Sequence, residues 1–198
     1  MTFLSAPAVG AGWFWDIGGG LGLIALSGLL YQASIGTGFR DARSHQFIGL
    51  FTVFMVAAHA FWYLLGDGVA ARYLWPPPVP FHMLCGVAGF LLLTLMTTVA
   101  MPGDRVRWHR SHRRFRQFHR ALSAIVIAAT LCHILGSGLY FSSWLEVTLL
   151  LTLALIAVLA APRMLSHMRP LPPLQAGTCI ISSLLLVALF AMARNFGL

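Results

Sequence analysis

The chain has 198 residues, of which 59% are hydrophobic and only 9% are charged, and its formal net charge is +8. Roughly a quarter of the residues in a soluble domain are charged, so this composition excludes an ordinary soluble protein and indicates an integral membrane protein. All 13 basic residues are arginines, and most of them lie between apolar stretches. This distribution is typical of loops that orient a protein in a lipid bilayer, and it argues against a nucleic-acid-binding module.

Six stretches are long and apolar enough to cross a bilayer as helices, which takes about 20 residues each. They cover residues 17–37, 46–65, 81–101, 118–140, 144–161 and 174–193. Proline and glycine residues punctuate the segments between them, as expected where helices end and begin. The sequence therefore predicts an all-α, polytopic membrane protein, in which residues 1–198 form a single domain built as a bundle of six transmembrane helices.

Glycines and cysteines inside these spans have less specific interpretations. Gly18 and Gly22 in the first span have a GxxxG spacing, which allows close helix contact but also fits a loosely formed helix start. Cys85, Cys132 and Cys179 form no CxxC pair. We expect these three cysteines to be small, buried core residues.

The arginines predict the orientation of the chain in the membrane. The loops after the first, third and fifth spans share one side and hold 11 arginines, whereas the opposite side holds only Arg72 and Arg194. By the positive-inside rule the basic loops face the cytoplasm. We therefore predict that both termini lie outside the cytoplasm, in a bacterial inner membrane.

Four histidines lie in two of the spans at matching positions. His45 and His59 in the second span are 14 residues apart, and so are His119 and His133 in the fourth. At 100° per residue, each pair falls on one helix face, with a rise of about 21 Å between its members. Because one span separates the two helices, they run parallel. His45 then shares a depth with His119, and His59 shares a depth with His133.

Ionisable residues inside a membrane are costly and usually functional. A low-spin b-type haem takes one imidazole on each side of its iron, so two cross-helix pairs predict two haem sites between the second and fourth helices. A rise of about 21 Å places one site in each leaflet of a hydrocarbon core about 30 Å thick. A single histidine in a span can instead hydrogen-bond a neighbour or face water, but equal spacing and matching depths favour haem ligation.

Two arginines border the first of these predicted sites. Arg43 and Arg120 are candidates for pairing with haem propionates, although the same residues also serve as positive-inside charges. His82, at the outer start of the third span, and the basic segment 105–120 have no assigned role.

The stretches RSHQFIGLFTVFMVAAHAFWY and WHRSHRRFRQFHRALSAIVIAATLCH resemble the ferric reductase-like transmembrane domain, over about residues 40–140. The resemblance implies that His45, His59, His119 and His133 are the axial iron ligands of two b haems. Full enzymes of this family append a flavin- and nicotinamide-binding region, which we do not find in this sequence. The glycine cluster at residues 18–22 lies in a span and lacks the strand–turn–helix context of a dinucleotide site.

These observations predict a di-haem b-type cytochrome that carries electrons across the bilayer as the membrane subunit of a reductase system. We expect a cytoplasmic flavoprotein reductase or a quinol to donate the electrons, so that flavin or quinone acts through a partner. The acceptor is expected to be a periplasmic partner or a small molecule. A quinol-oxidising cytochrome b anchor subunit is the alternative. A non-redox membrane scaffold or transporter subunit is the alternative from another class.

Overall fold

The computed structural model describes residues 12–35, 42–68, 72, 74, 78–101, 111–139, 141, 143–160 and 171–196. These residues are almost entirely helical, and no strand occurs among them. The fold is therefore all-α, as predicted.

Five of the described helices are long and apolar enough to cross a membrane. They are α1 (Gly12–Ser34), α2 (Ala42–Gly66), α4 (Phe81–Ala100), α6 (His112–Ser137) and α9 (Pro173–Phe196). The fifth predicted span is shorter in the described residues. It consists of α7 (Trp144–Leu155), which continues as the π-helical turn η1 (Ile156–Ala160), and residue 161 lies outside the described part.

Several helix ends have clear local causes. The Ser111 hydroxyl accepts a hydrogen bond from the Arg114 backbone N–H and so caps the start of α6, while Gly138 ends that helix in the left-handed conformation, with φ 64°. Ser143 and Glu146 form a reciprocal capping box at the start of α7. These caps satisfy backbone groups that a helix end leaves without partners inside the helix. Because α6 begins at His112, His119 lies two turns inside the helix rather than at its start.

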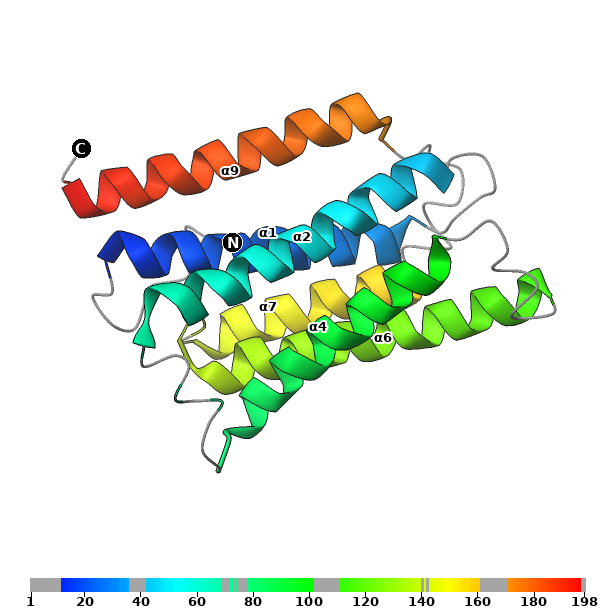
Figure 1. The fold of residues 1–198 in the computed structure, drawn as a ribbon, viewed down its shortest axis with the longest axis horizontal. Helices are drawn as coiled ribbons and strands as arrows, with labels where there is room; N and C mark the ends of the chain where they lie inside the picture. Colours follow the sequence, from blue (N-terminus) through cyan, green and yellow to red (C-terminus); the bar gives the residue numbers. More distant parts are fainter. Residues whose placement is uncertain are drawn as a thin grey trace.

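The helices pack as two groups, one around α1 and one formed by α4 and α6, and α1 also contacts α6 and η1 (Figure 1). α1 packs against α2 and α9, while α4 packs against α6, and α9 lies on the far side of α1 from α4 and α6. α2 and α6 make hardly any direct backbone contact in the described part of the chain. The two helices that carry the predicted histidine pairs are thus each supported by a different neighbour, α2 by α1 and α6 by α4.

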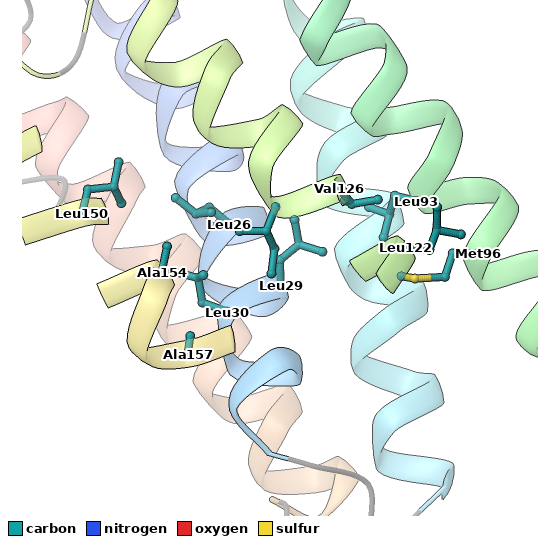
Figure 2. Close-up of a cluster of buried hydrophobic side chains, with 11 residues drawn as sticks. Leu26, Leu29, Leu30, Leu93, Met96, Leu122, Val126, Leu150, Ala154 and Ala157 are labelled. Atoms are coloured by element: carbon teal, nitrogen blue, oxygen red, sulfur yellow. The ribbon is translucent and has the colours of Figure 1, made fainter. Parts of the chain in front are cut away.

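Leucine and small residues form the core where α1, α4, α6 and the α7–η1 segment meet (Figure 2). Leu26 of α1, Leu93 of α4 and Leu150 of α7 are almost completely buried. Many other large apolar side chains are exposed, among them Leu91, Ile181 and Leu185. Exposed apolar side chains on spanning helices face lipid, so the core and the lipid-facing surface are comparably apolar, as in other membrane bundles.

A buried carboxylate attaches α9 to α1. Asp16 near the start of α1 accepts hydrogen bonds from Arg194 Nη1 at 3.3 Å and from Asn195 Nδ2 at 2.9 Å. The Asp16 side chain is only 6% exposed. A buried charge needs such partners, because leaving it without them costs several kcal/mol.

We predict that Asp16→Ala lowers the stability of the protein, since both donors on α9 then lose their acceptor. The expected loss is about 1–3 kcal/mol, measured by thermal unfolding in detergent. Gln175→Ala, an exposed position at the opposite end of α9, serves as the control and should change the unfolding temperature little. Equal effects of the two substitutions would contradict the importance of this contact.

Candidate functional site

The structure brings the four predicted histidines together in two cross-helix pairs. The ring centroids of His59 in α2 and His133 in α6 lie 6.3 Å apart, and their planes are 83° apart. Those of His45 in α2 and His119 in α6 lie 5.9 Å apart, with an angle of 62°. The partners are those that equal spacing on parallel helices requires. We refer to these as the His59–His133 pair and the His45–His119 pair.

Backbone carbonyls of neighbouring helices orient both rings of the His59–His133 pair. His59 Nδ1 is 2.8 Å from the Gly18 carbonyl oxygen in α1, and His133 Nδ1 is 3.0 Å from the His82 carbonyl oxygen in α4. A carbonyl oxygen only accepts, so each Nδ1 carries the proton and donates it. In a neutral ring this leaves Nε2 with a free lone pair. The same arrangement is found for metal-bound histidines, whose other ring nitrogen donates to a carbonyl or carboxylate.

Two glycines allow these rings to approach the neighbouring helices. A Cβ atom added at Gly22 would lie 2.9 Å from His59 Nδ1, and one added at Gly86 would lie 2.7 Å from His133 Nδ1. Any side chain at either position would push the ring away from its carbonyl acceptor. Of the two interpretations of the GxxxG spacing at Gly18 and Gly22, close contact with α2 is therefore the one observed.

The His45–His119 pair is held by different contacts. Gln32 of α1 donates a hydrogen bond of 2.8 Å from Nε2 to the His45 backbone carbonyl. The Phe115 ring, one turn before His119 on α6, stacks on the His119 ring with centroids 5.6 Å apart. These contacts fix the start of α2 and one face of the His119 ring.

Aromatic residues surround the His59 end of α1 and α2. The Tyr63 ring packs edge-on against the His59 ring at 5.2 Å, and the Tyr63 hydroxyl donates to the Trp15 carbonyl. Trp62 Nε1 donates to the Phe14 carbonyl at 2.8 Å. Paired tryptophan and tyrosine residues at the end of a spanning helix are typical of a membrane–water interface.

The described residues contain no group of three or more His, Cys, Asp or Glu side chains able to hold a metal ion. Each histidine pair supplies only two nitrogen ligands. A metal bound by such a pair would need its remaining ligands from outside these side chains, for example from water or from the four nitrogens of a porphyrin.

A comparison with known families finds a match. The model of the ferric reductase like transmembrane component family matches residues 21–130, which is more than half of the chain. The chain belongs to this family. No curated protein and no solved structure matches it. Ferric reductase-like domains generally bind haem, and the assignment indicates an integral membrane protein that acts as an electron-transfer component.

Several other predicted residues of this ferric reductase-like protein lie near the pairs in the described part of the chain. Arg43 and Arg120 have exposed side chains at the end of the bundle that holds the His45–His119 pair. The His82 ring lies 6.3 Å from the His133 ring, centroid to centroid. Residues 105–110 of the basic segment lie outside the described residues, whereas Arg113, Arg114 and Arg116 are exposed on the first turns of α6.

Some contacts of the site could not be found from the sequence. The carbonyl acceptors of Gly18 and His82 belong to the backbone, so no side-chain pattern identifies them. Gly86 lies in a span without charge, where glycine is common, and only its contact with His133 distinguishes it. A search for glycines near the depth of each histidine on adjacent spans would have selected Gly22 and Gly86 as candidates.

We predict that Gly86→Ala destabilises the protein, because its new methyl group displaces the His133 ring. Gly89→Ala is the matched control, since the nearest atom to its Cβ would be 3.6 Å away. In a helix interior, Gly→Ala alone is favourable by roughly 0.5–1 kcal/mol. Thermal unfolding should therefore show a gain for Gly89→Ala and a loss for Gly86→Ala. A gain for both would mean that the His133 ring is not confined by this glycine.

Proposed function

We propose that this protein is a di-haem b-type cytochrome that carries electrons across the membrane within a reductase system. The observation that carries the proposal is the pairing of the four histidines at two depths. An imidazole nitrogen binds a transition metal at about 2.0–2.1 Å, so two rings on opposite sides of one iron have centroids roughly 6 Å apart. The measured separations are 5.9 Å and 6.3 Å.

The positions of the helices also support two haems. α2 and α6 hardly touch each other in the described residues, so the histidine rings extend toward one another from helices that are held apart. The hydrogen bonds of His59 and His133 keep Nε2 directed away from α1 and α4, the helices that hold the acceptors. Haem iron supplies one-electron redox chemistry when bound. The protein's part is to hold the ligands in fixed orientation and in an apolar environment.

Charge at the His45–His119 end supports a role in electron entry. Four described arginines on α6 are exposed there, namely Arg113, Arg114, Arg116 and Arg120. Cations near a helix N-terminus gain nothing from the helix dipole, so their place there is not explained by helix stability. We propose that this end faces the cytoplasm, where a flavoprotein reductase or a quinol donates electrons, and that Arg43 and Arg120 pair with propionates of the nearer haem. Electrons then leave from the His59–His133 end to a periplasmic partner or a small molecule.

We predict that the purified protein contains about two b haems per chain and that single substitutions remove one each. His59→Ala and His133→Ala should abolish the same haem, and His45→Ala and His119→Ala the other, because a b haem of this type needs both ligands. The haem-to-protein ratio and reduced-minus-oxidised spectra measure this. His82→Ala is the control. Its backbone carbonyl, which accepts from His133, remains in place, so both haems should stay.

A colourless protein from haem-replete cells would overturn this proposal. Four variants with the spectrum of the unsubstituted protein would also contradict it and would favour a non-redox scaffold.

The proposed orientation can be tested with single cysteines in a variant whose native cysteines are replaced by alanine. Gly68 follows α2 and Arg113 lies at the start of α6, and both positions are exposed. A membrane-impermeant maleimide should label Gly68→Cys in cells whose outer membrane is opened. It should label Arg113→Cys only after the inner membrane is also permeabilised. The reverse result would place the arginine-rich end outside.

A further inference from the structure

Two cysteines from different helices face each other beside the His59–His133 pair. Cys85 in α4 and Cys132 in α6 have Sγ atoms 2.7 Å apart. Both are free thiols and half-buried. A disulfide bond has an S–S length of about 2.05 Å, so the atoms need to approach by only about 0.7 Å to bond. The two residues were expected to be ordinary core residues, and the proposed haem sites make no use of them.

Close packing of α4 against α6 produces this contact. Gly86 makes room for the His133 ring, and Gly136 makes room for the His82 side chain, whose Cβ would lie 2.6 Å from an added Cβ. The two helices therefore approach closely beside the thiols. The two thiols therefore lie in the contact between α4 and α6, which we call the α4–α6 seam. The same contact orients the His133 ring.

Small residues line the lipid side of this seam. Ala88 lies one turn after Cys85, Ala128 lies one turn before Cys132 and Gly136 one turn after it, and all three are exposed. Exposed positions inside spanning helices face lipid, so an apolar molecule in the bilayer can approach the half-buried thiols. A charged oxidant in water would have to enter the hydrocarbon region to reach them, which is costly.

We propose that Cys85 and Cys132 form a dithiol–disulfide couple that a membrane quinone oxidises. In this step both S–H bonds break and one S–S bond forms. The two electrons and two protons that the thiols lose pass to the quinone, whose two carbonyl oxygens become the hydroxyls of the quinol. The resulting disulfide joins α4 to α6 next to His133.

The test is a thiol count on the full chain in lipid nanodiscs, reduced, freed of reductant and kept anaerobic. The probe is a benzoquinone with every ring position substituted, so that thiol addition to the ring is blocked. Alkylation and mass spectrometry should show free thiols falling from three to one per chain, with one quinol formed per chain. Cys179, exposed on α9, should remain free.

Variants distinguish the pair from other reactions. Cys85→Ser and Cys132→Ser should each keep both remaining thiols, whereas Cys179→Ser should lose both. Oxidised glutathione, which is charged and water-soluble, should act at least tenfold more slowly than the quinone. Retention of three thiols, disulfide-linked dimers, or equal rates with both oxidants would overturn the proposal. Haem content is measured on the same samples but does not enter the thiol count, so the result stands apart from the proposed electron-transfer function.

Discussion

Hydrogen bonds between histidine rings and the backbones of neighbouring helices determine how the site is built. His59 and His133 each direct one ring nitrogen to a carbonyl oxygen, on α1 and α4 respectively. Gly22 and Gly86 allow this, because any side chain there would occupy the place of the ring. The histidine spacing alone sets the depth of the rings. The supporting helices set their orientation, and a metal ligand needs both.

The arrangement of the bundle reflects these two roles, in which some helices carry the histidines and others orient their rings. α2 and α6 carry the histidines but pack mainly on α1 and α4, and hardly on each other. Contact between side chains drives helix association in lipid, and α2 and α6 obtain most of that contact from α1 and α4 rather than from each other. Here the leucine core lies where α1, α4, α6 and α7 meet (Figure 2), whereas the closest approach of α2 and α6 is between the imidazole rings of the two histidine pairs.

The sequence was sufficient to predict the features that depend on hydropathy and on the spacing of residues along a helix. The all-α membrane fold followed from composition, and the pairing of His45 with His119 followed from equal spacing on parallel helices. Features that depend on the relative placement of two helices could not be predicted. The Cys85–Cys132 contact requires the axial offset and rotation of α4 against α6, and neither residue's surroundings in the sequence contain that information. The same holds for the contact of Asp16 with Arg194, which joins two ends of the chain 178 residues apart.

The α4–α6 seam connects the thiol pair to the histidine site through the backbone. Cys132 precedes His133 directly, and Cys85 lies one turn after His82, whose carbonyl orients the His133 ring. A covalent bond between the sulfurs would hold these two turns at a fixed distance. The hydrogen bond from His133 Nδ1 to the His82 carbonyl joins the same two turns, so the proposed disulfide would constrain the helices that this bond connects. His59 donates to a carbonyl of α1 instead, and neither thiol belongs to that helix. The proposed disulfide would therefore form next to His133, whereas the His45–His119 pair lies about 21 Å from the His59–His133 pair along the helices.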